Sequence, residues 1–250
     1  MDDSAVDGDG SPDEDGSRGQ DGSPGEDGSP DDEIPEEMVV GERRAPVVVA
    51  CLMAVGLPFA MPSAFRTGAG LMAAAIQLLL LGAMLVLDPG RIDRRSRPVH
   101  LVRLALIGSL AVGAAISAFR MAALILSRHG QKLSAGQLLW AGGLVWVHLV
   151  LAFAFLFWEL DAGGPGERAH HEPRPGDFAF PQQTDERLGA GDWRPEFFDY
   201  LHAAVTGALS FSPADVVSLT HRAKAATMVE SASALAILGL VVARAVNILG

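Results

Sequence analysis

Cysteine is nearly absent from this sequence: the chain has one, Cys51, among 250 residues. A single cysteine excludes an intrachain disulfide, and it excludes a zinc or iron–sulfur site built from the cysteines of one chain. Basic residues are nearly absent from the first 42 residues, which hold 16 Asp or Glu and only Arg18. The remaining residues carry 14 acidic and 18 basic side chains. The net charge of −11 therefore belongs to the N-terminal segment.

The same N-terminal segment has few bulky apolar residues. An Asp-Gly-Ser unit recurs every six residues, at 9–11, 15–17, 21–23 and 27–29. Residues of this kind bury too little apolar surface to offset the entropy of ordering, so we predict a disordered acidic tail over residues 1–44. A secretory signal peptide would need a basic start and an apolar centre. The twelve-residue calcium loop that ends in Glu is also absent, which disfavours a calcium site at the Asp-Gly pairs.

Four long apolar stretches follow the tail, over residues 46–65, 68–87, 101–126 and 138–158. Each approaches the ~20 residues that a helix needs to cross about 30 Å of hydrocarbon. We expect helices, because a segment in lipid must satisfy its backbone polar groups internally. Pro58 and Pro62 are expected to kink or shorten the first helix. Trp140 and Trp158, near the two ends of the fourth stretch, are expected at the membrane interface.

Arginines between the stretches set the expected orientation. The link 88–100 is the most basic, whereas the link 62–67 has only Arg66 and the link 127–134 has Arg128 and Lys132. The positive-inside bias places the link 88–100 in the cytoplasm, and the N-terminus with it. We therefore predict a multi-pass membrane protein with a cytoplasmic N-terminus. The basic link carries Arg91, Arg94, Arg95 and Arg97.

Residues 160–197 are polar and rich in Gly and Pro, which predicts an extramembrane loop. His170, His171 and Glu172 lie together there, but no further ligands stand at helical spacing, so a solvated loop is favoured over a metal site. A short apolar segment, 198–211, follows; it is too short to cross a bilayer comfortably. After an interruption at 210–215 and a polar link at 218–224, a final helix is expected over 225–249. This order is typical of a re-entrant pore loop.

Residues 199–246 resemble, without a gap, the pore helix, filter and inner helix of two-span potassium channels. Asp199-Tyr200-Leu201 matches the start of the pore helix, Asp215 the Asp that ends the filter, and Glu230 the acidic position of the inner helix. The remaining matches are Thr220, Ala223 and Lys224, which lead into the inner helix, and Val242-Ala243-Arg244 near its end. The resemblance covers about a fifth of the chain and implies a re-entrant pore helix.

Over its whole length the chain is also similar to an uncharacterised bacterial family of multi-pass membrane proteins. That resemblance implies a location in the bacterial plasma membrane and carries no assigned activity. It rests on Asp88-Pro89-Gly90-Arg91-Ile92, Trp158-Glu159-Leu160-Asp161, Phe180-Pro181-Gln182 and Ala243-Arg244-Ala245-Val246-Asn247.

The filter positions depart from the channel pattern. Ser210-Phe211-Ser212-Pro213-Ala214 stands where the channels have Thr-Val-Gly-Tyr-Gly. Potassium filters coordinate the ion with successive backbone carbonyls, and their glycines permit backbone angles that other residues resist. Pro213 fixes its own φ near roughly −65° and removes an N–H. We therefore expect a pore-like module without potassium selectivity.

Charges within the apolar helices are further candidates. Glu230 is interpreted either as an ion or proton site, or a brace to the pore helix through Ser210 or Ser212, or as an interfacial carboxylate. Arg120 is expected to reach toward the Arg128 side of the membrane, since no Arg ladder surrounds it. His148, His202 and Asp199 are more simply explained as helix-packing polar groups than as a proton relay.

The predicted topology contains a conflict. With the N-terminus inside and four spans before it, the loop 160–197 returns to the cytoplasm, whereas potassium channels place that loop outside. Three alternatives stay open: residues 198–211 cross the bilayer, the arginine bias misleads, or residues 46–65 form a hairpin that does not span.

The sequence thus predicts an all-α integral membrane bundle of five or six spans, with a re-entrant pore helix and a disordered tail. Its parts are the tail 1–44, a four-helix region 45–159, the loop 160–197 and the pore-like module 198–250. The expected partners are the lipid bilayer and further copies of the chain, a tetramer if it forms a pore. The rival hypothesis is a non-conducting membrane scaffold or subunit. Enzymatic, cofactor, metal and nucleic-acid functions are not indicated.

Overall fold

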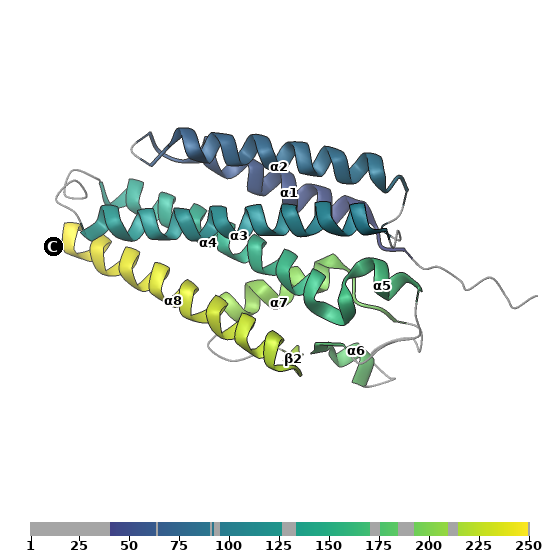
Figure 1. The fold of residues 1–250 in the computed structure, drawn as a ribbon. Coiled ribbons are helices and arrows are strands. Elements are labelled where there is room, and N and C mark those ends of the chain that lie inside the picture. Colours follow the sequence, from purple (N-terminus) through teal and green to yellow (C-terminus); the bar gives the residue numbers. More distant parts are fainter. Residues whose placement is uncertain are drawn as a thin grey trace, which may run out of the picture. The chain divides into compact units, whose positions relative to one another are not determined.

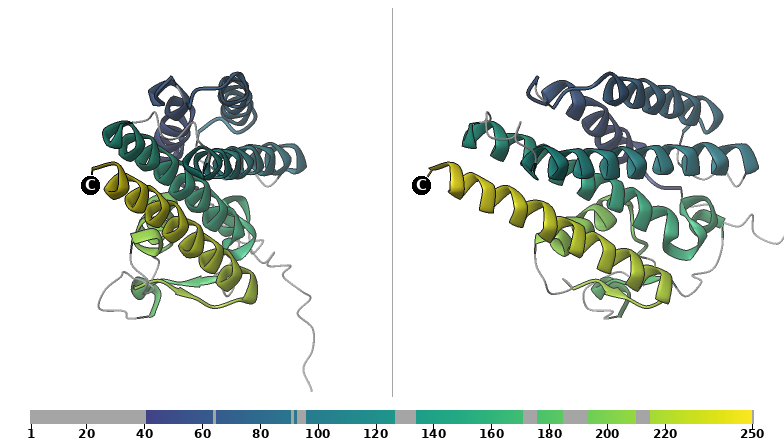
Figure 2. Two further views of the ribbon diagram at one scale, coloured as in Figure 1. Left: turned by 90° about the vertical axis from the view of Figure 1, so that its left-hand side faces the viewer. Right: turned by 60° about the vertical axis from the view of Figure 1, so that its left-hand side comes forward.

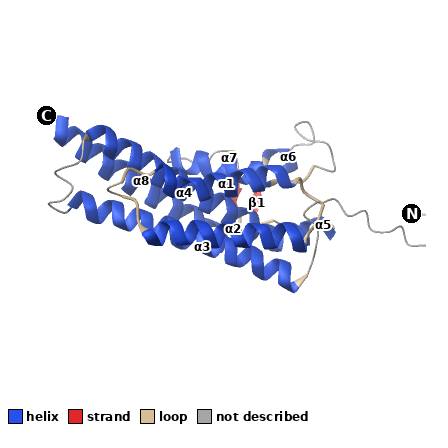
Figure 3. Ribbon diagram, turned by 90° about the horizontal axis from the view of Figure 1, so that it is seen from above, coloured by secondary structure: helices blue, strands red, loops and turns tan. Residues whose placement is uncertain are grey.

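The computed structural model describes residues 41–63, 65–90, 92, 96–126, 134–170, 176–184, 193–209 and 215–249. Almost all of the described secondary structure is helical (Figures 1 and 3), which confirms the all-α prediction. The exception is a short antiparallel ladder of β1 (Phe178–Ala179) and β2 (Val217–Ser218), in which Phe178 pairs with Ser218 and Ala179 with Val217.

Four helices are long and apolar enough to cross a membrane, by length and composition: α2 (Gly68–Leu87), α3 (Arg97–Leu126), α4 (Ala135–Leu160) and α8 (His221–Leu249). The apolar helix α1 (Arg44–Ala60) is shorter, at 17 residues. The expectation of five or six full spans thus reduces to four candidate spans and one shorter helix among the described residues.

Local sequence explains where these helices begin and end. Helix α1 ends before its predicted limit because Met61 precedes Pro62, and a residue before proline is restricted to extended backbone; its ψ is 138°. Pro58 lies inside α1 without ending it. Helix α4 begins with a capping box, in which the Ser134 and Gln137 side chains each accept a hydrogen bond from the other residue's backbone N–H. Helices α3 and α8 both begin earlier than predicted, so the links at 88–100 and 218–224 are shorter.

Helix α4 is the centre of the bundle. It contacts α1, α3 and α8, and Figure 2 shows it between α8 on one side and α1 to α3 on the other. In an apolar 18-residue stretch of α4, 61% is buried, against 22% in the corresponding stretches of α2 and α8. Phe155, Phe157 and Trp158 near its end are among the largest fully buried side chains. The interior of the bundle is therefore built around α4.

The outer faces of α2, α3 and α8 are apolar and exposed. Leu79 and Val86 on α2, Phe119 on α3 and Met228 on α8 each expose more than two thirds of their surface. Large contiguous apolar surfaces of this kind are rare on soluble monomers and typical of surfaces that face lipid or another subunit. By helix length and composition, the bundle is suited to a multi-pass membrane protein.

The chain between α4 and α8 folds into short elements. They are η2 (Asp161–Gly163), α5 (Pro165–His170), β1, α6 (Pro181–Thr184), α7 (Phe197–Leu209) and β2. Helix α7 corresponds to the predicted short apolar segment and has 13 residues. It packs against both α4 and α8.

Candidate functional site

The start of α7 is held on the end of α4 by aromatic rings. The Phe197 ring centroid lies 4.7 Å from that of Phe155 and 5.7 Å from that of Trp158. Tyr200, one turn further on, lies against Phe180 with centroids 5.4 Å apart. Edge-to-face and tilted pairs at these distances are favourable beyond the area they bury. The first turn of α7 is thus fixed to the last turns of α4.

Asp161, directly after α4, is the hub of a buried polar cluster. Its Oδ2 accepts a hydrogen bond of 2.5 Å from the Tyr200 hydroxyl. Its Oδ1 accepts hydrogen bonds from the backbone N–H groups of Asp177 and Phe178, at 2.6 and 3.1 Å. Gly176 permits this approach, because a Cβ there would lie 2.8 Å from the Asp161 Oδ1. One carboxylate therefore joins the end of α4, the start of β1 and the start of α7.

Arg168 on α5 links the same cluster to the residues before α1. It donates to the backbone carbonyls of Trp158 and Asp161 at 2.8 and 2.7 Å, and to Glu42 Oε1 at 2.8 Å. The Trp158 indole donates to the other Glu42 oxygen at 2.7 Å. Burial by itself would lower the pKa of Arg168, but the oxygens of Tyr200 and Glu42 beside it raise that pKa. The guanidinium stays charged and satisfies the last carbonyls of α4.

Asp177 ties the start of α8 to β1. It accepts two hydrogen bonds of 2.6 Å from the Arg222 guanidinium and one of 2.5 Å from the Thr220 hydroxyl. Burial by itself would raise the pKa of Asp177, but the hydrogen bonds from Arg222 and Thr220 hold it below its usual value. Leu219 N–H also donates to the Asp177 carbonyl at 2.8 Å. The start of α8 therefore lies beside β1.

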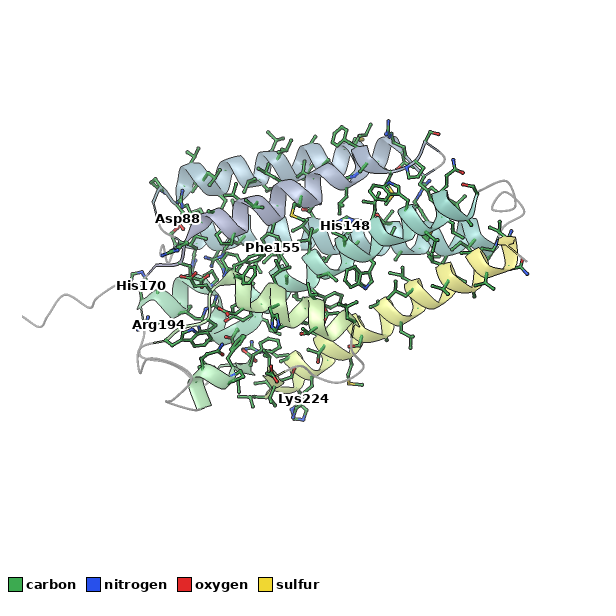
Figure 4. All side chains as sticks on the ribbon, turned by 180° about the vertical axis from the view of Figure 1, so that it is seen from behind. Asp88, His148, Phe155, His170, Arg194 and Lys224 are labelled. Atoms are coloured by element: carbon green, nitrogen blue, oxygen red, sulfur yellow. The ribbon has the colours of Figure 1, made fainter. Side chains whose placement is uncertain are left out.

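A second cluster of charged side chains, at the same end of α4 as Asp161, joins α3 to α4. Arg103 Nε and His100 Nδ1 each lie 3.0 Å from a carboxylate oxygen of Glu159. Gly164 lies against this carboxylate, and a Cβ there would be 3.1 Å from the carboxylate carbon and from both of its oxygens. The φ of Gly164, +93°, also favours glycine. Asp88, His170 and Arg194 also lie at this end of the bundle, as Figure 4 shows. Charged pairs are thus concentrated where α4 ends.

Glu230 lies away from this end, inside the contact between α7 and α8. Its side chain is 0% exposed. A Cβ on Gly207 of α7 would lie 2.9 Å from Glu230 Oε2, so the absence of a side chain at 207 makes room for the carboxyl group. The neighbouring Ser231 hydroxyl donates to the Gly207 carbonyl at 3.1 Å. Among the described residues neither carboxyl oxygen has a hydrogen-bond partner.

The two interpretations of Glu230 can now be compared with its position. Glu230 is fully buried where α8 packs against α7, nine residues after His221. Among the described residues its carboxyl group lies beside Gly207 of α7 and makes no hydrogen bond there. Ser210 and Ser212, through which the brace was expected, lie outside them, as do Phe211, Pro213 and Ala214.

The other predicted residues are dispersed. Asp215 is exposed just before β2, and Arg120 is exposed late in α3. Its expected neighbour Arg128 lies outside the described residues, as do His171 and Glu172. Trp158 lies at the expected end of α4, where it is 1% exposed and its indole N–H donates to Glu42.

Sequence analysis did not single out Asp161, Arg168 and Asp177 as functional residues. A carboxylate directly after an apolar helix was the available signal for Asp161. Among the described residues no group of three or more His, Cys, Asp or Glu is arranged to hold a metal ion. Comparison with models of protein families, with curated proteins and with solved structures finds no match to this chain.

Proposed function

We propose that this chain is a multi-pass membrane protein in which α7 enters the bilayer and returns to the same side. In this proposal α4, α7 and α8 line an ion pathway within a homo-oligomer, and that pathway is not selective for potassium. One observation carries the proposal: both ends of the segment from Phe197 to Ser218 are fixed at the same end of α4, while Gly207 lies beside Glu230.

The depth of α7 supports a re-entrant arrangement. Its 13 residues span about 20 Å at 1.5 Å per residue, less than the hydrocarbon thickness of about 30 Å. Glu230 is nine residues along α8 from His221, which corresponds to a depth of roughly 14 Å. A half-helix that ends near the middle of a membrane is a recurrent feature of channels and transporters.

The arginine bias then gives the pathway an orientation. Arg44 pairs with Asp88, and His100 and Arg103 pair with Glu159, so the basic link between α2 and α3 lies at the same end as Asp161. By the positive-inside bias this end is cytoplasmic. The proposal takes none of the three alternatives left by the sequence: it keeps the arginine bias and a re-entrant α7. The α7 loop then opens to the cytoplasm, opposite to potassium channels.

Cysteine labelling tests the re-entrant arrangement. In a Cys51→Ser background, Gln183→Cys and Leu219→Cys lie on either side of α7, and Gly136→Cys at the other end of α4 is the control. We expect an impermeant maleimide to label 183 and 219 from one side of oriented vesicles and 136 from the other. Labelling of 183 and 219 from opposite sides would show that α7 crosses the membrane and would refute the arrangement.

Conduction is tested separately with purified protein in planar bilayers. We expect a tetrameric mass, single-channel currents and a potassium-to-sodium permeability ratio near one. A ratio well above one would contradict the absence of potassium selectivity. A monomeric mass without currents would refute the pore.

A non-conducting membrane subunit is the second candidate. It is favoured by Glu230, whose carboxyl group is enclosed between α7 and α8 of a single chain. A monomer that crosslinks to other membrane proteins and carries no current would support this candidate.

A further inference from the structure

A cavity of about 90 Å³ lies between α1, α2, α3 and α4, away from the Asp161 cluster. Small residues of α2 make room for it: Gly70 faces Pro58 of α1, with 3.7 Å between a Cβ on Gly70 and the proline Cβ. The cavity begins at Arg66 and Thr67, in the link between α1 and α2, and extends to His148 on α4. Its volume equals that of about three water molecules at ~30 Å³ each.

The inner end of the cavity is polar at the middle of the bundle. His148 is the fourteenth of the 26 residues of α4, and Gln77 is the tenth of the 20 residues of α2. Figure 4 shows His148 well away from the end where Asp88 and His170 lie. The His148 side chain is 6% exposed and that of Gln77 is 2% exposed. A buried polar pair at this depth is costly unless it has partners.

Gly113 on α3 positions this pair. A Cβ there would lie 3.1 Å from His148 Cε1 and 3.8 Å from Gln77 Nε2, so both side chains occupy the space beside the bare glycine. His148 Nε2 is buried and has no hydrogen-bond partner among the described residues. Two hydrogen-bonding groups therefore face one small cavity, and one of them is unsatisfied.

The outer part of the cavity is positively charged. Arg66 and Arg120 both line it, and both are exposed. Among the described residues that line the cavity, none is acidic. Arg66 donates to the carbonyls of Phe59 and Met61 at 2.7 and 3.2 Å, which fixes its charge beside the end of α1. The arrangement combines a cationic opening, apolar walls and a hydrogen-bonding floor.

We propose that this cavity binds a small carboxylate anion of the size of formate or acetate. The two arginines attract the anion and lower the cost of bringing its charge below the surface. His148 and Gln77 supply hydrogen bonds at the inner end, and Leu57, Ile116 and Val145 of the walls accommodate a methyl group. The site lies at the opposite end of the bundle from the proposed cytoplasmic opening of the α7 loop, so it opens toward the outside.

Equilibrium binding of radiolabelled acetate to the purified full-length protein tests the proposal. We expect saturable binding of one acetate per chain, displaced by formate. Arg120→Gln should weaken it about tenfold, because the variant removes one of the two positive charges that attract the anion. Arg97→Gln, an exposed arginine at the other end of the same helix, is the matched control and should leave the affinity unchanged.

Three further variants distinguish a loss of binding from a loss of folding. His148→Leu should abolish saturable binding, and its helicity and mass relative to the parent protein report on folding. Gly113→Ala, whose Cβ would displace the imidazole, should weaken binding in the same direction, whereas Gly108→Ala on the same helix meets no atom within 4 Å and should not. Absence of saturable acetate binding, or equal affinity in the Arg120 and Arg97 variants, would overturn the proposal. Either outcome leaves the conduction measurement unaffected.

Discussion

The contact between α4 and α8 allows one perturbation to be worked out in detail. A Cβ on Gly142 would lie 2.8 Å from both methyl carbons of Val241 and 3.3 Å from its Cβ. Comfortable carbon–carbon contacts lie near 3.5–4.0 Å, so the added methyl group is about 1 Å too close. Rotation about the Val241 χ1 angle does not relieve the contact, because the Cβ of that residue is itself too near.

The expected magnitude follows from two opposing effects. Gly142→Ala gains up to about 1 kcal/mol of helix propensity within α4. The clash costs about 1–3 kcal/mol, the usual penalty for an extra carbon in a packed contact. Gly143→Ala is the matched control, because its Cβ meets no atom within 4 Å and only the propensity gain applies. The control should therefore exceed the Gly142 variant in unfolding free energy by about 1–3 kcal/mol.

The assay is unfolding in mixed micelles with increasing dodecyl sulfate, followed by helical circular dichroism. A double-mutant cycle with Val241→Ala adds a second readout, since the shortened side chain leaves space for the new methyl group. We expect the Gly142 penalty to fall substantially in the Val241→Ala background, with a coupling energy of about 0.5–3 kcal/mol. Equal stability of the Gly142 and Gly143 variants, without coupling to Val241, would refute the packing of α4 on α8 described above.

Two further predictions concern the polar groups. Gly207→Ala should destabilise the protein by about 1–3 kcal/mol, because its methyl group would push on the enclosed Glu230. Gly239→Ala on α8 is the control, because its Cβ meets no atom within 4 Å. Equal unfolding midpoints of the two variants would contradict the close contact between Gly207 and Glu230. Because the folded-state pKa of Asp177 is lowered, its stabilising effect is present above the unfolded pKa of about 4 and is lost as pH falls through the folded value. The stability advantage of the parent over Asp177→Asn should therefore shrink below about pH 4, and a pH-independent advantage would argue against the pairing with Arg222.

Much of the helical framework follows from hydropathy alone. The bounds of α2 agree with the predicted stretch 68–87, and α7 occupies most of the predicted short segment. The end of α1 was also available from the sequence, since the restriction that Pro62 places on Met61 is local. Capping by Ser134 and Gln137 likewise needs only four consecutive residues. Features fixed by neighbours in the chain could be predicted.

The polar cluster at the end of α4 could not be predicted in the same way. Arg168 reaches Glu42 across 126 residues of chain, and Tyr200 reaches Asp161 across 39, so both contacts form only after the chain has folded back. The sequence also does not show which sides of α2 and α3 face the bundle interior, because a helix that is apolar on all sides has no distinct polar face. The meeting of His148 with Gly113 depends on which side of α3 faces the interior.

The distribution of polar contacts indicates what holds this bundle together. In lipid, apolar side chains gain little by burial, so helix association relies on close packing and interhelical hydrogen bonds. Close packing is evident at Gly142 and Gly113, and the strongest hydrogen bonds cluster at Asp161 and Asp177. These two carboxylates fix both ends of the chain segment that carries α7. The start of α7 is therefore fixed by the Asp161 cluster, while Gly207 near its end lies beside Glu230 of α8.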